Sequence, residues 1–381
     1  MCLIVTKQTG FDYSATIKPS LLNEPNNNTY PFIQNKDFDG VNINYNTDFY
    51  IPKTVAESFP KILIDRPSLL ISISGKIGNV GLYVNNNKAF IGGAVGICKL
   101  KNQKDGLVTL YHLLSEAGQN YFSSLIKASS HSNITVEDIR KLPISIPEND
   151  DEKEMLGKFF TAIDNLITLH QRKYEKLKNV KKSMLEKMFP KNNSKFPEIR
   201  FKGFTDAWEQ RKLGECATYR RGSFPQPYGN PEWYGGENAM PFVQVADVGN
   251  NMKLTDSTKQ TISKLAQPMS VFIPKDSVVV TLQGSIGRVA ITQYDAYLDR
   301  TVLFFEKFKS ETNTNFWSYL IKNKFEYEAR LAPGGTIKTI TKEALSDFDL
   351  ILPKVEEQSK LGAFFSKLDN LITLHQRKVF V

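Results

Sequence analysis

Apolar side chains recur every three or four residues along one otherwise polar stretch in the middle of the chain. The steps alternate between four and three residues, an average of 3.5, which is the spacing of a coiled-coil seam. Pro147 and the acidic pair at 150–151 stand just before this stretch and are typical of a helix N-terminus. The pattern predicts one helix over residues 149–190, of which about 37 residues are helical, giving a length of roughly 55 Å at 1.5 Å per residue. Its first seam positions are Leu156, Phe160, Ile163, Ile167 and His170, and the seam continues through Tyr174 and Leu177 to Met188.

The same pattern returns near the end of the sequence. Residues 156–173 and 361–378 are identical at 14 of 18 positions. Pro353 and the acidic pair at 356–357 supply the start signals, so a second helix is predicted over residues 353–381. Two helices that share one seam pattern are expected to pair, here as an antiparallel coiled coil. The second set of seam positions is Leu361, Phe365, Leu368, Ile372 and His375.

Weaker matches at a similar offset extend the repeat beyond the helices. SGKIGNVGL at 74–82 matches QGSIGRVAI at 283–291, and ITVEDIRKLPISIP at 134–147 matches ITKEALSDFDLILP at 340–353. A period of this length is too long for a solenoid. The chain is therefore two copies of one unit, and each copy is a variable block followed by a helix that hardly varies.

The variable blocks differ from the helices in composition. Runs such as SLLISISG and SVFIPKDSVVVTLQG are rich in β-branched and aromatic residues and are interrupted by Gly, Asn and Pro, which is typical of short strands. Each block is predicted to be α+β, with a mixed, mostly antiparallel sheet and helices. The predicted parts are a first block over 1–148, the first helix over 149–190, a linker over 191–198, a second block over 199–352 and the second helix over 353–381.

Charge and hydropathy narrow the class of protein. The formal net charge is +9, from 49 basic and 40 acidic side chains, which weakly favours a polyanionic partner such as nucleic acid. No apolar run approaches the ~20 residues that span a bilayer. The N-terminal sequence MCLIVTKQTG does not have the layout of a secretory signal. These features predict a cytoplasmic protein that does not enter a membrane.

Both blocks carry the sequence G-x-I-G between two predicted strands, with glycines at 75, 78, 284 and 287. Neither copy is a phosphate-binding motif, because each continues into a strand and not into a helix. One interpretation is a tight turn in which glycine adopts positive φ. The other is a loop that faces DNA. On the second interpretation the contact residues are Lys76 and Asn79 in the first block and Ser285 and Arg288 in the second.

The second block opens with ATYRRGSFPQPYGNPEWYGG, a mixture of cations, polar side chains and aromatic rings at 217–236. Such a mixture suits a nucleic-acid surface. An ordinary loop anchored by buried aromatic residues, with solvated arginines, has the same composition. The candidate DNA-binding residues of this block are Arg220, Arg221, Ser223, Arg300 and Lys338.

The residues give no indication of catalysis by this chain. The four histidines show no metal-ligand spacing, and no paired carboxylates, nucleophile with its base, or cofactor motif is apparent. His170 and His375 occupy matched seam positions, where a polar residue commonly fixes register. No catalytic residue, metal or cofactor is therefore assigned to this chain.

The order of parts resembles the specificity (S) subunit of type I restriction-modification enzymes. The resemblance covers nearly the whole chain. It is carried by the two helices with LHQRK and by the linker FPEIRFKGFTDAWEQRKLGE at 196–215, and the G-x-I-G elements support it.

The resemblance implies that DNA recognition and catalysis are carried out by different subunits. Each variable block would be a target recognition domain that reads one half of a bipartite site in double-stranded DNA, and the paired helices would hold the two domains apart. The subunit would not be catalytic. It would bind methyltransferase (modification) subunits that use S-adenosylmethionine and, through them, restriction subunits that use ATP and Mg²⁺.

The second helix departs from this pattern. The sequence reaches Val381 soon after the second LHQRK, whereas the first helix continues from Tyr174 to Met188. We therefore expect the segment from Tyr174 to Met188 to lack an apolar partner, and the chain to assemble less stably with other subunits.

Two rival interpretations come from other classes of protein. The chain could be a DNA methyltransferase or nuclease that acts alone, which would have to modify or cut DNA without partners. It could also be a coiled-coil scaffold whose variable blocks bind protein, which would show no affinity for random duplexes at low salt.

Overall fold

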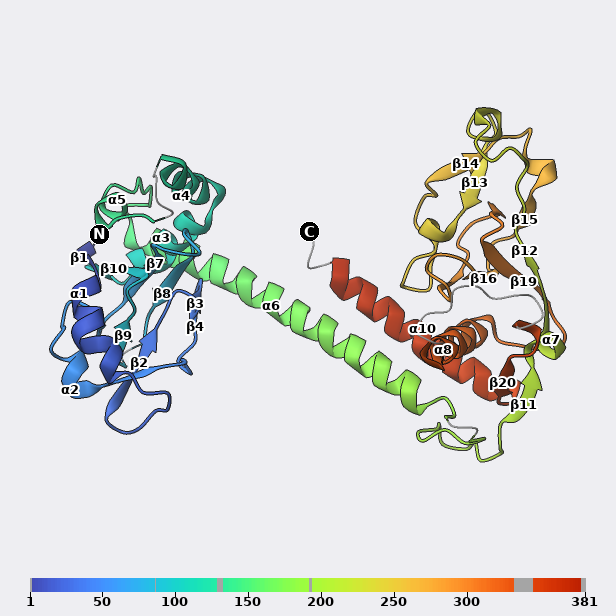
Figure 1. Ribbon diagram of the computed structural model, residues 1–381, viewed down its shortest axis with the longest axis horizontal. Helices are drawn as coiled ribbons and strands as arrows, with labels where there is room; N and C mark the ends of the chain where they lie inside the picture. Colours follow the sequence, from blue (N-terminus) through green and yellow to red (C-terminus); the bar gives the residue numbers. More distant parts are fainter. Residues whose placement is uncertain (1, 86, 129–132, 192–193, 332–344, 378–381) are drawn as a thin grey trace. The chain divides into compact units, whose positions relative to one another are not determined.

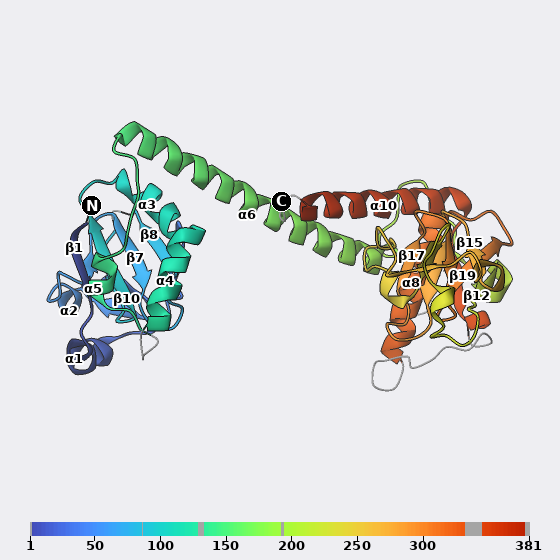
Figure 2. The ribbon, with the colours of Figure 1, turned by 90° about the horizontal axis from the view of Figure 1, so that it is seen from above.

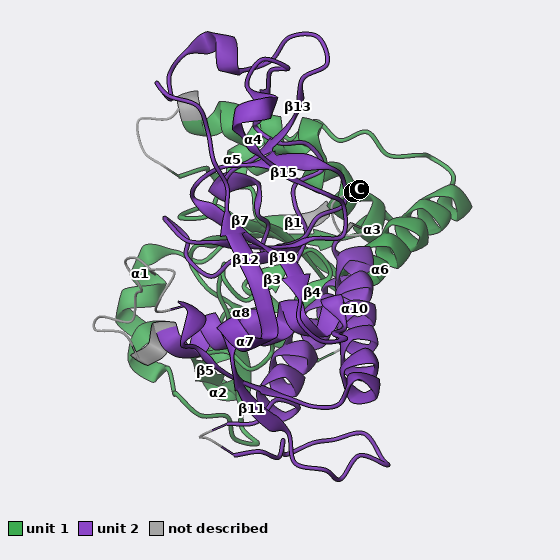
Figure 3. Cartoon of the chain, turned by 90° about the vertical axis from the view of Figure 1, so that its right-hand side faces the viewer, with its two compact units in different colours: residues 1–168 green, residues 169–381 purple. Residues whose placement is uncertain are grey.

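The computed structural model describes residues 2–85, 87–128, 133–191, 194–331 and 345–377. Its contacts divide the chain into two compact units, residues 1–168 and 169–381, which Figure 3 colours separately. The helix α6 (Asp150–Lys187) begins in the first unit and ends in the second. Each unit has hydrophobic cores of its own.

Two four-stranded sheets form the centre of the first unit (Figure 1). The first sheet is antiparallel throughout, in the order β1 (Cys2–Lys7), β10 (Val95–Leu100), β7 (Ser68–Ser72) and β8 (Val80–Tyr83). The second has the order β5 (Tyr50–Pro52), β2 (Thr29–Ile33), β9 (Ala89–Ile91) and β6 (Leu63–Ile64), in which only β2 and β9 are parallel. β3 (Phe38–Asp39) and β4 (Asn42–Ile43) form a small hairpin.

Helices cover the first sheet of this unit. α3 (Asp105–Leu114) and α4 (Glu116–Ala128) pack on it through Leu110, Leu113 and Phe122. The shorter helices are α1 (Gly10–Asp12), α2 (Lys53–Ala56) and α5 (Val136–Arg140). The first turn of α6 is anchored to α3 by the ion pair Lys153–Asp105, whose Nζ and Oδ1 atoms are 2.9 Å apart with both side chains 10% exposed.

The second unit repeats this plan. Its first sheet has the order β12 (Ala217–Arg221), β19 (Val302–Phe308), β16 (Val278–Thr281) and β17 (Val289–Ile291), and is antiparallel. Its second sheet has the order β14 (Gln260–Ile262), β13 (Met240–Val243), β18 (Ala296–Leu298) and β15 (Val271–Ile273), in which only β13 and β18 are parallel. The added pair is β11 (Glu209–Lys212) and β20 (Asp349–Leu352).

Two long helices complete the second unit, α8 (Thr314–Leu331) and α10 (Val355–Arg377), together with the short α7 (Leu213–Cys216). α10 lies beside the C-terminal part of α6 in both Figure 1 and Figure 2. Their side chains share one core with Trp208 and Trp317. The predicted α+β class, with two mostly antiparallel units and long helices, is confirmed.

Candidate nucleic-acid interface

Three loops of the second unit meet at one end of its first sheet. The register pairs Arg221 of β12 and Val280 of β16 with the same residue of β19, Leu303. The N–H of Gly222 donates to the carbonyl of Val302 (3.0 Å), and that of Leu282 to the carbonyl of Thr301 (2.8 Å). The chain that leaves β12, the chain that leaves β16 and the chain that enters β19 are therefore neighbours. We call residues 220–223, 282–288 and 299–301 the second sheet end.

Six of the predicted DNA-binding residues belong to this second sheet end. Arg220, Arg221, Ser285 and Arg300 are exposed, and Ser223 and Arg288 are half-buried. Arg220 lies 4.0 Å from Glu306 in an exposed ion pair, which leaves its guanidinium accessible. Ser223 Oγ donates to the carbonyl of Met269 (3.1 Å), so this hydroxyl also ties the loop to the turn at Gln267–Met269. Lys338 lies outside the described residues. The predicted residues, scattered over 81 positions of sequence from 220 to 300, come together because of the strand order.

The aromatic residues of the 217–236 loop are mainly structural. The Phe224 ring lies within 5.3 Å of the rings of Tyr228 and Tyr234, centroid to centroid. The hydroxyl of Tyr228 donates to Asp299 Oδ2 (3.2 Å). Burial, aided by the Asp299 charge, raises the pKa of Tyr228 to about 12, so its hydroxyl keeps its proton. The guanidinium of Arg300 lies 5.8 Å from the Tyr228 ring centroid. The loop is thus a packed platform that orients Arg300.

The first unit has a corresponding sheet end. Lys7, the last residue of β1, pairs with Gly96 of β10, which in turn pairs with Ile71 of β7. These positions match Arg221, Leu303 and Val280 of the second unit. Lys7 and Lys76 are both exposed.

Lys7 was not a sequence-based candidate. Only the strand pairing, which places it level with Arg221, identifies it. We call residues 7–9, 73–79 and 92–94 the first sheet end.

The G-x-I-G elements form the same turn in both units. All four glycines have positive φ, from 65° at Gly284 to 85° at Gly78. A methyl group on Gly287 would lie 2.8 Å from Phe325 Cβ, and one on Gly78 would lie 3.1 Å from Gln119 Oε1. The tight-turn interpretation is confirmed. The turns also expose Lys76 and Ser285, so the two interpretations are compatible.

Asn79 is a correction to the predicted contact residues. Its side chain is 8% exposed, and its Nδ2 atom donates to the carbonyls of Asn35 (3.1 Å) and Phe38 (2.8 Å). Both amide hydrogens therefore serve the backbone next to the turn. Asn79 holds the first sheet end together and does not face a ligand. Its counterpart in the repeat, Arg288, remains a candidate.

The long helices pair in an antiparallel direction within the second unit. His170 of α6 lies against His375 of α10, with the two Nδ1 atoms 3.0 Å apart, so one ring donates and the other accepts. Farther along α6, Lys181 forms an ion pair with Asp369, and the Phe189 ring lies 5.9 Å from the Phe365 ring. Rising numbers in α6 thus meet falling numbers in α10.

This direction corrects the expectation that Tyr174 to Met188 lacks a partner. Leu177, Met184 and Met188 pack in one core with Leu361, Phe365 and Leu368 of α10. The expectation assumed that equal repeat positions lie opposite one another along the whole helix. In an antiparallel pair, only the position at the centre, His170 with His375, meets its own equivalent.

The remaining seam residues have contrasting environments. In α10, Leu361, Phe365 and Leu368 are buried and Ile372 is half-buried. In α6, Leu156 is half-buried, and Phe160, Ile163 and Ile167 are between 38% and 40% exposed.

The segment at 196–215, which opens the second block, contributes structural residues that the sequence did not reveal. Trp208 is 1% exposed and packs against Phe189. Arg200 donates from Nε and Nη2 to the two carboxylate oxygens of Glu357, each at 2.7 Å, and this carboxylate raises the pKa of Arg200. A bidentate pair of this kind fixes both side chains. The segment at 196–215 is therefore tied to the first turn of α10.

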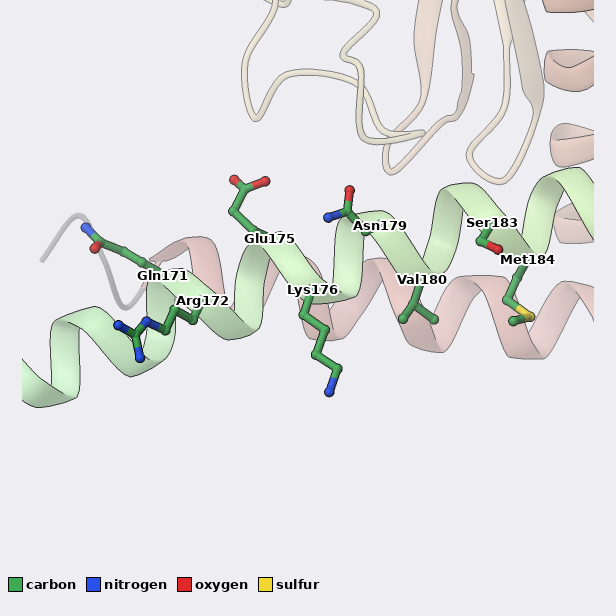
Figure 4. Close-up of a pocket in the computed structure, with 8 residues that line it drawn as sticks. All are labelled: Gln171, Arg172, Glu175, Lys176, Asn179, Val180, Ser183 and Met184. Atoms are coloured by element: carbon green, nitrogen blue, oxygen red, sulfur yellow. The ribbon is translucent and has the colours of Figure 1, made fainter. Parts of the chain in front are cut away.

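An open groove of about 730 Å³ runs along one stretch of α6 (Figure 4). Its lining mixes charged, amide, hydroxyl and apolar side chains, which are not arranged around a common centre. The lining residues are Gln171, Arg172, Glu175, Lys176, Asn179, Val180, Ser183 and Met184.

Within the described parts of the chain, no group of three or more His, Cys, Asp or Glu side chains is placed to hold a metal ion. None of the helices in those parts is long and apolar enough to cross a membrane.

Two curated proteins are similar to this chain in sequence. The type I restriction enzyme MjaVIII specificity subunit of Methanocaldococcus jannaschii is 22% identical over 352 residues, 86% of this chain and 80% of that protein. The MjaX specificity subunit of the same organism is 25% identical over 313 residues, 79% of this chain and 71% of that protein.

A solved structure shares the fold. The crystal structure of the S subunit of a type I restriction-modification system from M. genitalium superposes with a TM-score of 0.58 at 13% identity, over 99% of this chain and 89% of that one. The family model described as type I restriction modification DNA specificity domain matches twice, at residues 11–179 and 205–379. The chain therefore belongs to the family of type I restriction-modification DNA specificity proteins.

Proposed function

We propose that each sheet end reads one half of a bipartite site in double-stranded DNA. The observation that carries this proposal is that both units repeat one backbone frame, meaning the same strand register and the same G-x-I-G turn. In both units this frame carries exposed cations at the loop end of the sheet. Lys7 and Lys76 in the first unit, and Arg220, Arg221 and Arg300 in the second, all belong to the loop end of an antiparallel sheet.

The side chains suit two parts of such a complex. Lysine and arginine neutralise phosphates, and arginine also forms two hydrogen bonds to the major-groove edge of guanine. The turns hold these side chains on a rigid sheet, which limits the entropy lost on binding. Because the side chains differ between the two sheet ends, the two half-sites should differ in sequence.

The chain recognises DNA and leaves the chemistry to other subunits in this proposal. Methyltransferase subunits would use S-adenosylmethionine, and restriction subunits would use ATP and Mg²⁺. The support is that the chain's relatives are named specificity subunits of type I restriction enzymes. The complex would act in the cytoplasm, where these subunits and DNA meet.

A charge reversal tests the second sheet end. The double variant Arg220→Glu/Arg221→Glu should bind duplex DNA roughly 10- to 100-fold more weakly near 0.1 M salt, because two phosphate contacts become repulsive. Fluorescence anisotropy of a labelled duplex, titrated with the chain co-expressed with its methyltransferase subunits, measures the affinity. The slope of log affinity against log salt should also fall by about two.

The control carries the same charge change elsewhere in the unit. Lys307→Glu/Lys309→Glu lies at the far end of β12 and β19 and should leave the affinity within about twofold. Equal losses in both variants would show a general charge effect and contradict the proposed surface. An absence of any duplex binding by the complex would favour the scaffold interpretation.

A further inference from the structure

Gln8, at the first sheet end, has a buried amide that forms no hydrogen bond with the described residues. The side chain is 3% exposed, and neither Oε1 nor Nε2 has a partner in the part of the chain that the structure describes. An amide that is withdrawn from water without a replacement bond costs free energy, and an apolar side chain of the same shape would avoid that cost. Packing alone therefore gives no reason for a glutamine at this position.

The buried amide lies directly beneath a glycine of the neighbouring loop. A Cβ atom built on Gly93 would lie 2.9 Å from Gln8 Oε1, so a side chain at residue 93 would displace the amide. Gly93 itself is exposed. Residue 93 thus contributes no side chain between the amide of Gln8 and the solvent.

The turn that contains Gly93 has the same backbone hydrogen bonds as the turn that contains Arg300. In each, the N–H of the preceding residue donates to the carbonyl that ends a parallel strand, from Gly92 to β2 (2.8 Å) and from Asp299 to β13 (3.0 Å). The carbonyls of Gly92 and Asp299 then accept from the N–H three residues farther on, at 3.2 and 3.0 Å. Gly93 and Arg300 are therefore equivalent positions of the two units.

Gln8 and Gly222 are equivalent as well, because each is the first residue after the outer strand of its sheet, β1 or β12. A Cβ atom on Gly222 would lie 2.1 Å from the carbonyl oxygen of Leu298, so this position has no space for a side chain. The first unit therefore has its side chain on the outer-strand loop and its glycine on the turn, and the second unit has the reverse. At this place in the frame, Gln8 is the counterpart in space of the exposed Arg300.

We propose that Gln8 is the base-reading residue of the first unit and that it recognises adenine. On DNA the amide turns out past Gly93 and forms two hydrogen bonds with the major-groove edge of one adenine, donating from Nε2 to N7 and accepting at Oε1 from the N6 amino group. This inference rests on the proposed function of the first sheet end, where Lys7 and Lys76 supply the phosphate contacts. Because the amide has no described partner in the free chain, the two bonds to adenine are gained without the loss of others.

Duplexes that carry 7-deazaadenine test this contact without changing a base pair. The methylated sequence of a host that expresses the chain with its methyltransferase subunits supplies the recognised site. Labelled duplexes of that site receive 7-deazaadenine at one adenine at a time, and fluorescence anisotropy measures the affinity of the natural complex for each. We expect the substitution at one adenine to weaken binding roughly tenfold, because the acceptor of the Gln8 amide is lost.

Gln8→Met identifies which adenine is read by this side chain. Methionine is unbranched and of similar length but cannot form the two bonds, so the variant complex should bind the unmodified duplex roughly tenfold more weakly. The 7-deazaadenine substitution at the same adenine should then cost less than about twofold more. Gln8→Leu is a second variant with the same expectation. Thermal melting by circular dichroism should give both variants a midpoint no lower than that of the natural chain, because they remove an unpaired buried amide.

Gln103→Met is the matched control. Gln103 is exposed and lies beyond the opposite end of β10, so the same exchange of side chains occurs away from the first sheet end. This variant should keep the affinity for the unmodified duplex, and its sensitivity to each 7-deazaadenine, within about twofold of the natural complex.

Two results would overturn the inference and leave the proposed function intact. The natural complex could prefer its site over a random duplex and still tolerate 7-deazaadenine at every adenine. Alternatively, the Gln8 variants could keep the full sensitivity of the natural complex at every adenine, which would assign those contacts to other residues or subunits. A natural complex with no preference for the site over a random duplex would contradict the proposed function as well.

Discussion

The two sheet ends share a frame and differ in the side chains that the frame presents. In both units an outer strand, a central strand and a third strand meet in the same register, and G-x-I-G makes the same turn. The turn exposes Lys76 in the first unit and Ser285 in the second. Buried β-branched strands and positive-φ glycines fix the frame, and loop side chains outside the core can vary without a packing cost. Such a pair suits two readers of different sequences.

The clearest difference within this frame lies at one repeat position. Asn79 of the first unit is buried and bonded to two backbone carbonyls, whereas Arg288 of the second is half-buried at the edge of the turn. The same turn thus uses this position for stability in one unit, whereas in the other the side chain is half-exposed and is a proposed DNA contact.

The largest expected effect comes from breaking the shared turn. Gly287→Ala should destabilise the second unit by about 2–4 kcal/mol, because alanine is strained at a φ of 80° and its methyl would meet Phe325. Differential scanning calorimetry should show the transition of this unit lowered by roughly 5–15 °C.

A matched variant separates strain from collision. A methyl group on Gly284 would meet nothing closer than Val245 Cγ1 at 3.7 Å, so Gly284→Ala should cost about 1–2 kcal/mol, from backbone strain alone. Equal losses of stability in Gly287→Ala and Gly284→Ala would mean that the collision with Phe325 of α8 adds nothing to the backbone strain.

A smaller effect distinguishes Asn79 from Arg288. Asn79→Ala removes two buried hydrogen bonds and should cost about 1–3 kcal/mol of stability while leaving the recognised DNA sequence unchanged. Arg288→Ala should change the melting behaviour by less than about 0.5 kcal/mol and should weaken or relax recognition of the second half-site. Chemical denaturation and duplex binding are measured on both variants. A loss of stability in Arg288→Ala together with a change of recognition in Asn79→Ala would contradict this comparison.

Local pattern was sufficient to predict much of the fold. The 4,3 spacing and its repetition predict both long helices, and the strand-rich runs predict the α+β class. α6 begins at Asp150 and the described part of α10 ends at Arg377. Each of these features depends on residues close together in sequence.

Features that depend on distant residues could not be predicted in the same way. The sequence of α6 does not say which of its halves is covered, because this depends on the direction of α10. Lys7 becomes a candidate only through its pairing with β10, nearly 90 residues away in the sequence. The buried role of Asn79 could not be predicted because its acceptors, the carbonyls of Asn35 and Phe38, lie more than 40 residues upstream.

Exchanging one variable block tests whether each unit recognises one half-site. Residues 199–352 are replaced by the corresponding block of another specificity subunit, and methylated adenines are mapped across the genome of a host that expresses the chimera with its methyltransferase subunits. We expect one half of the bipartite methylated sequence to change and the other half to be retained. A methylated sequence that changes in both halves, or in neither, would contradict the assignment of one half-site to each unit.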